Sequence, residues 1–374
     1  MNHWLPALYK KEGLRKGISQ TIIDNAISSI NKILDKRLPL ILTLGHLAYH
    51  TDIPYHELQL FVDRRKYSYR DFRIKKRSGG FRMISVPSQK LLHVQKWINK
   101  FILSKAEANP YSFAFIEGKS VKQCAETHLG CKWLIKIDLR HFFESISEIQ
   151  VYEYFHSLGY SKLLAFELAR ICTKTYRLDS IKYDNDYWRT RTYRTYKIYQ
   201  DKRIGHLPQG APTSPMLANC IVKNLDYAIA KYTTERDIIY TRYADDLIFS
   251  TTNPNFGMKN ANTLISYVYR LLPNYGLKPN TQKTNILHPG ARKIVLGLLV
   301  DSDKLRLTKD FRTSLECHLF FSCKDPIGHS IQRGFNSILG LKNYINGLLS
   351  YVKYIDQDYY LKLKKRKLIP TWPI

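Results

Sequence analysis

Apolar residues recur at intervals of three to four positions in several stretches of the chain, which is the spacing of one buried helix face. Between positions 21 and 34 the apolar residues are Ile22, Ile23, Ala26, Ile30, Ile33 and Leu34. The same spacing predicts helices over 42–49, 55–62, 91–104, 149–158, 163–176, 214–231, 261–272, 309–321, 330–350 and 359–367. The pair at 42–62 has the order of a helix-turn-helix, but two helices packed on the main body are the simpler interpretation.

Other segments have the pattern of strands. Residues 72–76 and 81–87 alternate in character around Arg77-Ser78-Gly79-Gly80, which predicts a β-hairpin with basic outward positions. The runs 133–139 and 238–250 are largely apolar, as in buried strands, although both contain aspartates. Strands interleaved with helices predict an α+β fold.

The composition of the chain indicates what kind of partner the protein binds. The 374 residues include 59 Lys and Arg against 31 Asp and Glu, a formal net charge of +28, and 44% are hydrophobic. We therefore expect a folded protein of two or three subdomains that binds a polyanion. No window has the roughly 18–20 apolar residues of a spanning helix, and the N-terminus lacks the order of a secretory signal. These features predict a cytoplasmic protein with no membrane partner.

The six cysteines form no C-x-x-C pair, so reduced and mostly packed thiols are expected rather than a zinc site or disulfides.

The aspartates within the apolar runs are the candidate functional residues. A tight turn would hold Asp245 and Asp246 at a sheet edge, and a neighbouring strand ending at Asp138 would bring three carboxylates together. Buried carboxylates are costly unless compensated, and a hard cation such as Mg²⁺ is the natural compensation. Two such ions would suit phosphodiester synthesis. A solvated Asp-Asp turn is the alternative, which the apolar flanks disfavour.

Several motifs of the chain resemble those of a known protein family. Tyr243-Ala244-Asp245-Asp246 resembles the signature of reverse transcriptases, and the segment 207–215 resembles the loop and helix start that precede it. Asp138-x-x-x-Phe142-Phe143-x-Ser145-Ile146 stands in the right order. Further matches extend the resemblance from about 69 to 300: Gly79-Gly80-x-Arg82, Phe113-x-Phe115-x-x-Gly118-Lys119-Ser120, Gly276-Leu277-x-x-Asn280-x-x-Lys283-Thr284 and Gly297-Leu298.

The resemblance implies a right-hand polymerase fold with an antiparallel palm sheet and helical N-terminal and thumb regions. The expected division is a helical N-terminal region at 1–68, fingers at 69–135, a palm at 136–300 and a helical thumb at 301–374.

Bacterial retron enzymes are the most similar reverse transcriptases in length, in their short helical N-terminus and in their compact thumb without an appended nuclease domain. Their N-A-x-x-H element corresponds to Ala125-Glu126-Thr127-His128, with Cys124 in place of Asn. Their V-T-G element corresponds to Val295-Leu296-Gly297, without the Thr. The resemblance implies that Ala125, His128, Val295, Leu296 and Gly297 bind the enzyme's own RNA.

The family's metal ligands correspond to Asp138, Asp245 and the backbone carbonyl of Leu139, with Asp246 completing the acidic cluster. Two Mg²⁺ ions are implied, with Mn²⁺ as a substitute. Lys283 would protonate the departing pyrophosphate, although a merely solvated lysine is the alternative.

The nucleotide site is implied by a second group of residues. Phe143 would lie under the incoming sugar and exclude a 2′-hydroxyl, with a plain core position as the alternative. Arg82, with Lys75 or Lys76, would hold the triphosphate. Gln209 and Gly210 would line the nucleotide and template pocket.

Two basic stretches fall outside these motifs. The segment 176–205 resembles an insertion in which Arg189, Arg191 and Arg194 alternate with aromatic residues, a pattern suited to stacking on unpaired bases. It would bind structured RNA or a protein partner, or form a solvated hairpin without a role. The run 362–367 is expected in a thumb helix that grips a duplex, rather than as a nuclear address.

The resemblance therefore implies an RNA-directed DNA polymerase of the retron type that uses dNTPs. It would copy its cognate non-coding RNA from a 2′-hydroxyl into branched, RNA-linked single-stranded DNA (msDNA), and act in anti-phage defence with a separate effector protein. The alternatives are another bacterial defence or group II intron-type reverse transcriptase with a different primer, and a non-catalytic RNA-binding scaffold of the same fold.

Overall fold

The computed structural model describes residues 5–65, 67–75, 79–107, 109–175, 204–366, 368–370 and 372. The chain starts with four helices, α1 (Pro6–Arg15), α2 (Gln20–Asp35), α3 (Leu44–Thr51) and α4 (Tyr55–Asp63). The last three match the predicted helices, whereas α1 was not predicted. Its apolar residues are largely exposed, so its sequence lacks a strong apolar stripe.

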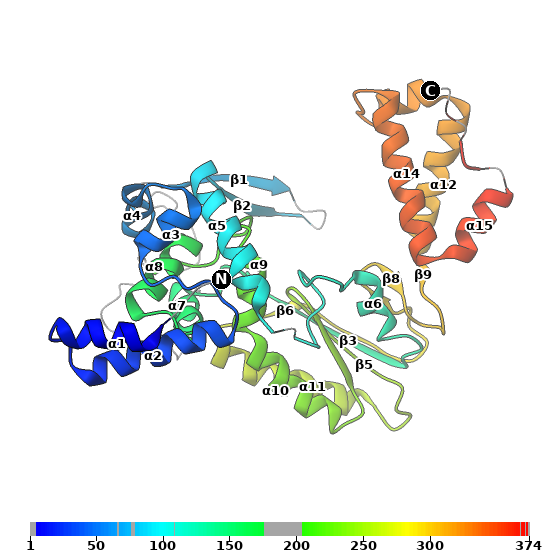
Figure 1. The fold of residues 1–374 in the computed structure, drawn as a ribbon. Helices are drawn as coiled ribbons and strands as arrows, with labels where there is room; N and C mark the ends of the chain where they lie inside the picture. Colours follow the sequence, from blue (N-terminus) through cyan, green and yellow to red (C-terminus); the bar gives the residue numbers. More distant parts are fainter. Residues whose placement is uncertain are drawn as a thin grey trace.

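The predicted hairpin forms and is called the fingers hairpin below. Its strands, β1 (Tyr69–Lys75) and β2 (Phe81–Pro87), pair antiparallel with Phe72 opposite Ile84. Figure 1 shows it projecting from the body toward the side on which the C-terminal helices stand. Helices α5 (Gln89–Phe101), η1 (Leu103–Lys105) and α6 (Val121–Glu126) follow.

Four strands form the antiparallel palm sheet in the order β4-β5-β3-β6. They are β3 (Trp133–Leu139), β4 (Ile239–Tyr243), β5 (Asp246–Thr251) and β6 (Pro279–Leu287). The expected apolar run 238–250 is thus a hairpin. The edge strand β6 was not predicted, because its sequence is mostly polar and half-buried or exposed.

Hydrophobic cores pack against both faces of the palm sheet, so alternate residues of β3 belong to different cores. Ile135, Ile137 and Leu139 belong to the larger core, whereas Leu134 belongs to a second core shared with the C-terminal part. Because side chains alternate between faces, Asp138 lies on the same face as Leu134.

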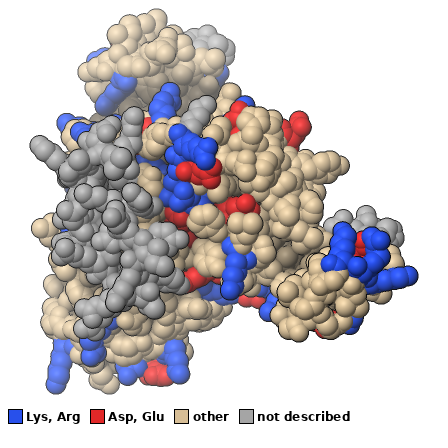
Figure 2. Space-filling view, turned by 90° about the vertical axis from the view of Figure 1, so that its left-hand side faces the viewer, with Lys and Arg blue, Asp and Glu red and all other residues tan. Residues whose placement is uncertain are grey.

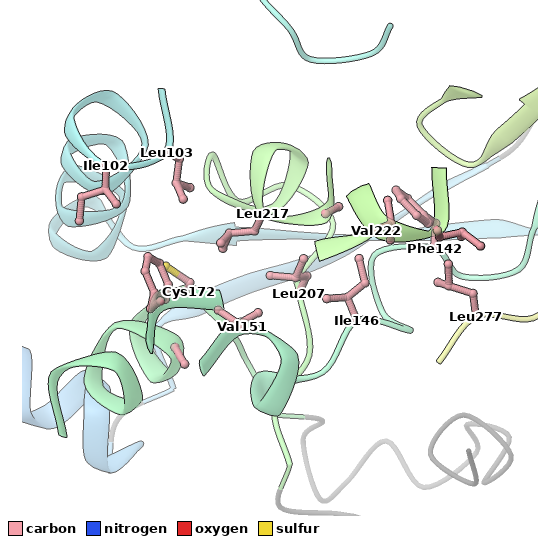
Figure 3. Close-up of a cluster of buried hydrophobic side chains, with 14 of the residues drawn as sticks. Ile102, Leu103, Phe142, Ile146, Val151, Cys172, Leu207, Leu217, Val222 and Leu277 are labelled. Atoms are coloured by element: carbon pink, nitrogen blue, oxygen red, sulfur yellow. The ribbon is translucent and has the colours of Figure 1, made fainter. Parts of the chain in front are cut away.

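The larger core also contains five helices and a 3₁₀ turn: α7 (Glu148–Ser157), α8 (Lys162–Cys172), α9 (Ser214–Ile221), α10 (Lys223–Thr234), α11 (Met258–Leu271) and η5 (Leu272–Tyr275). In Figure 1, α10 and α11 lie along the palm sheet, and Figure 3 shows Ile146, Val151, Leu207 and Leu217 within the core. The single helix expected over 214–231 is wrong, because the backbone leaves the helical conformation at Val222 between α9 and α10.

The C-terminal part begins with a small sheet of β7 (Ile294–Val295), β8 (Leu298–Leu299) and β9 (Arg306–Leu307). Four helices follow: α12 (Lys309–Lys324), α13 (Pro326–Gln332), α14 (Ile338–Ile355) and α15 (Gln357–Lys365). One helix over 330–350 was expected, and this is wrong because Gly334 adopts a positive φ of 72° after α13. In Figure 1, α12, α14 and α15 stand apart from the rest of the body.

The expected α+β architecture, with an antiparallel palm sheet and helical terminal regions, is confirmed. All six cysteines are free thiols, three of them buried. Among the helices of the described residues, none combines the length and apolar character needed to cross a membrane. The segment 176–203, which carries Arg189, Arg191 and Arg194, lies outside the described residues, as does Lys76.

Candidate active site

Three aspartates meet at one end of the palm sheet. Asp246 begins β5 and faces Asp138 of β3 in the antiparallel register, while Asp245 occupies the turn between β4 and β5. Ala244 closes this turn with a positive φ of 54°, and the Leu139 backbone N–H donates to the Asp245 carbonyl over 2.9 Å. The strand pairing therefore brings together the carboxylates that are far apart in the sequence.

The electrostatics of this cluster are unfavourable without a further cation. Burial raises the pKa of Asp246 to about 6, and the negative charges of Asp245 and Asp138 add to the effect. Burial also raises the pKa of Asp245, again with a contribution from Asp138. Three carboxylates at close range resist simultaneous ionisation unless positive charge is supplied.

Part of that charge comes from β6. Lys283 Nζ lies 3.0 Å from Asp138 Oδ2, and Asn280 Nδ2 donates to Asp138 Oδ1 over 2.9 Å. With the side chains in these positions, no group of three or more His, Cys, Asp or Glu in the described ranges is arranged to hold a metal ion. The Lys283 side chain is 56% exposed, so another cation can replace its ammonium group beside Asp138 at little cost in free energy.

The chemistry of the donor set nonetheless fits a divalent cation. Carboxylate and carbonyl oxygens are the ligands that Mg²⁺ and Mn²⁺ accept, and the raised pKa values mark a deficit of positive charge at the same position.

The loop before α9 lies against the fingers hairpin. The Ser85 N–H of β2 donates to the Gln209 carbonyl over 2.8 Å. Gly210 follows with a φ of 119°, and a Cβ there would come within 2.9 Å of the Ser85 carbonyl oxygen. Only glycine accepts this φ and leaves room for the Ser85 carbonyl. Gly210 therefore allows the loop before α9 to pack closely against the fingers hairpin.

Of the other residues expected at the nucleotide site, only Arg82 has an electrostatic effect on the acidic cluster within the described residues. Arg82 is exposed on β2, and its charge acts on the Asp245 carboxyl. Lys75 is exposed at the end of β1. The half-buried Phe143 ring contacts the rings of Phe142 and Phe115, at centroid distances of 5.4 and 6.2 Å.

The residues expected to bind RNA divide into two groups. His128, Ala125 and Val295 are each 0% exposed, which contradicts direct RNA contact by these side chains. His128 is held between Ser250 Oγ at 2.6 Å and Thr241 Oγ1 at 2.7 Å, and burial lowers its pKa to about 4.

His128 therefore remains neutral and joins β4 to β5. Leu296 is half-buried and Gly297 is exposed, both with positive φ in the β7–β8 turn, so their contact with RNA stays a prediction.

Sequence reasoning missed a buried ion pair beneath the aspartate turn. Arg242 of β4 is 0% exposed, and its Nη2 lies 2.7 Å from Asp226 Oδ2 of α10. Arg242 Nη1 also donates to the Ala244 carbonyl over 3.2 Å and to Asn219 Oδ1 over 3.0 Å. An arginine within the apolar run 238–250 was the signal available in the sequence. The network holds the turn that carries Asp245.

Charge is unevenly distributed over the surface. In Figure 2, Lys and Arg side chains gather in the middle of the face and on a protruding part, with smaller acidic patches between them. Such an arrangement suits contact with phosphates around a local acidic site.

Comparison with known proteins assigns the family. The family model described as reverse transcriptase (RNA-dependent DNA polymerase) matches residues 74–319, more than half of the chain. The chain is 30% identical to the retron Ec86 reverse transcriptase of Escherichia coli, over 86% of this chain and 92% of that protein.

The retron Mx65 reverse transcriptase of Myxococcus xanthus is 28% identical over 80% of this chain and 64% of that protein. Among solved structures, a telomerase from Candida albicans aligns with a TM-score of 0.44 and 12% identity, covering 83% of this chain and 58% of that chain.

The family match also fits the architecture, since the antiparallel palm sheet with its aspartate turn is the centre of the right-hand polymerase fold expected above. The chain therefore belongs to the reverse transcriptases, RNA-directed DNA polymerases, and within them to the retron reverse transcriptases of bacteria.

Proposed function

We propose that this retron reverse transcriptase copies its cognate non-coding RNA into msDNA by two-metal nucleotidyl transfer from dNTPs, starting at a 2′-hydroxyl of the RNA. One observation carries the proposal: Asp138, Asp245 and Asp246 converge, and the pKa values of Asp245 and Asp246 are raised. Carboxylates whose negative charge is only partly compensated in the isolated protein are suited to holding divalent cations beside a polyphosphate.

In this proposal Asp138, Asp245 and the Leu139 carbonyl hold two Mg²⁺ ions, with Asp246 completing the cluster. When bound, the ions would activate the attacking hydroxyl and stabilise the charge of the leaving pyrophosphate. Asn280 orients the Asp138 carboxylate through its 2.9 Å hydrogen bond. Lys283, 3.0 Å from the same carboxylate, is the candidate proton donor for the leaving group.

The remaining residues bind and orient the nucleotide. Arg82 and Lys75 of the fingers hairpin hold the triphosphate, because both are exposed cations near its free end. Gln209 and Gly210 line the nucleotide and template pocket, and their contact with β2 supports the hairpin that carries Arg82. Phe143 is the gate that excludes a 2′-hydroxyl.

We further propose the division given above into an N-terminal region, fingers, palm and thumb, together with anti-phage defence alongside a separate effector protein. The basic helix α15 has Lys362, Lys364 and Lys365 in its last turn, which suits a thumb that contacts a duplex backbone.

The first experiment is to purify the protein from cells that carry its non-coding RNA and analyse the bound nucleic acid. We expect DNA joined covalently to RNA, released by ribonuclease with a branched nucleotide. Bound RNA without DNA would contradict the msDNA proposal and favour the scaffold alternative. DNA that is not joined to RNA would favour a reverse transcriptase with another primer.

The second experiment tests the site. Asp245→Asn should abolish DNA synthesis and leave RNA affinity nearly unchanged, since it removes one charge from an isosteric side chain. Asp303→Asn, in an exposed loop, is the matched control and should keep full activity. DNA synthesis by Asp245→Asn at the wild-type rate would refute the metal-ligand assignment.

A further inference from the structure

The Phe143 ring contacts two other phenylalanine rings, and the function proposed above uses only Phe143. Phe143 contacts Phe142, which is buried, and Phe115, whose side chain is 50% exposed. Phe115 belongs to the segment 113–120, which the family resemblance singled out without a role. An exposed aromatic ring packed on a second, functional ring calls for an explanation.

The backbone of Phe115 is strained. Its φ is 61°, in the left-handed region that residues other than glycine rarely adopt. Such strain persists only when the surrounding structure imposes it, and it concentrates at functional sites. A solvent-exposed phenylalanine in this conformation is not required for core packing.

The surroundings that impose this conformation are visible. Asn219 Nδ2 donates to the Ala114 carbonyl over 2.8 Å, directly before Phe115. The Phe113 N–H donates to the Arg242 carbonyl over 2.9 Å, and the Arg242 N–H donates to the Tyr111 carbonyl over 2.7 Å. The segment is thereby fixed to β4, the strand that leads into the aspartate turn.

The same buried network holds both parts of the site. Arg242 donates through Nη1 to the Ala244 carbonyl of the aspartate turn and to Asn219, which in turn bonds the segment before Phe115. Phe115 is thus positioned relative to the carboxylates by neighbours that are almost completely buried.

We propose that Phe115 is a positioning residue for sugar selection: its ring supports Phe143 from the exposed side, so that the Phe143 ring cannot yield to a 2′-hydroxyl. Phe142 supports it from the buried side. This inference rests on the proposed gate role of Phe143. It adds that selectivity against a 2′-hydroxyl depends on the Phe115 ring, which contacts the Phe143 ring. The network of Arg242 and Asn219 beneath the aspartate turn holds the segment that carries Phe115.

The test compares two substitutions that remove the ring in different ways. Phe115→Ala removes the ring and keeps the backbone strain, whereas Phe115→Gly removes the ring and relieves the strain, because glycine accepts a positive φ. Phe115→Gly therefore controls for misfolding. Tyr55→Ala, on α4, is the matched control with a similarly exposed ring at 48%.

The readout is the ratio of kcat/KM for a dNTP to kcat/KM for the matching rNTP, measured on a primed RNA template with thermal unfolding in parallel. Both Phe115 variants should lower this ratio about three- to tenfold, the range expected for losing one aromatic pair. The kcat for the dNTP and the ratio of Tyr55→Ala should stay close to wild type. In a Phe143→Ala background, Phe115→Ala should change nothing further.

The possible failures are distinguishable. If Phe143→Ala relaxes selectivity while either Phe115 variant keeps the wild-type ratio, the inference about Phe115 is refuted and the gate remains. If Phe143→Ala itself keeps the wild-type ratio, the gate proposal fails and the inference fails with it. Additive effects of the two substitutions would refute the claim that Phe115 acts through Phe143.

Discussion

The acidic cluster makes the folded protein less stable at neutral pH than it would be without one of its charges, and Asp246→Asn tests this. The pKa of Asp246 is raised from the ordinary 3.8 to about 6, mainly by burial and then by Asp245 and Asp138. One step in pKa corresponds to about 1.4 kcal/mol, so the ionised carboxylate opposes folding by about 3 kcal/mol above pH 6.

The pH dependence follows from the direction of the change. Between pH 4 and pH 6 the folded protein binds a proton that the unfolded chain has released, so wild-type stability falls as the pH rises through this window. Below pH 4 the Asp246 carboxyl is protonated in both the folded and the unfolded chain, and its effect on stability vanishes. Asn carries no titrating proton, so Asp246→Asn should lack this fall.

The assay is urea unfolding followed by tryptophan fluorescence in EDTA at several pH values. Asp246→Asn should unfold with a free energy higher than wild type by up to about 3 kcal/mol at pH 7.5, with the difference disappearing near pH 4. Asp303→Asn, in an exposed loop, should stay within about 0.5 kcal/mol of wild type at every pH.

Magnesium provides an independent check. Because it would bind the carboxylates of the folded state, its addition should stabilise the wild type more than Asp246→Asn. An Asp246→Asn variant that is equal to or less stable than wild type at pH 7.5 in EDTA would refute the reasoning, since the charge would then already be compensated within the protein.

Three further predictions concern the supports of the site. Gly210→Ala should destabilise the protein by about 1–3 kcal/mol in thermal unfolding, because its Cβ would stand 2.9 Å from the Ser85 carbonyl at a φ of 119°; an unchanged midpoint would contradict this. Asp226→Asn leaves Arg242 buried without its counter-ion and should cost about 3–5 kcal/mol in urea unfolding, far more than a surface pair. Lys283→Gln removes an exposed ion pair and should leave stability within about 1 kcal/mol, yet lower kcat for DNA synthesis; an unchanged kcat would exclude Lys283 as the proton donor.

Much of the candidate site could be predicted from the chain, because its carboxylates lie within local sequence patterns. An Asp-Asp pair between two apolar runs predicts a hairpin turn that holds carboxylates at a sheet edge, and the structure has that turn between β4 and β5. The helix periodicities predicted α2, α3 and α4 because each presents one buried stripe, which is a property of the sequence alone.

Other features depended on contacts between distant segments. Strand β6 has a polar sequence, and only its pairing with β3 makes it a strand and brings Asn280 and Lys283 to Asp138. His128 was expected to contact RNA, but β4 and β5 enclose it with two hydroxyls, and no local pattern specifies that burial.

Local sequence patterns identify the candidate residues for the chemistry, because charge, apolar flanks and turn residues act over a few positions. The environment of these residues depends on the fold: the register that sets Asp138 opposite Asp246, the ion pair of Arg242 with Asp226 and the strained backbone of Phe115. Burial is the main cause of the raised pKa of Asp246, and the neighbouring Asp245 adds like charge. Burial and the further contribution of Asp138 arise only when distant segments come together, with β3 pairing against β5.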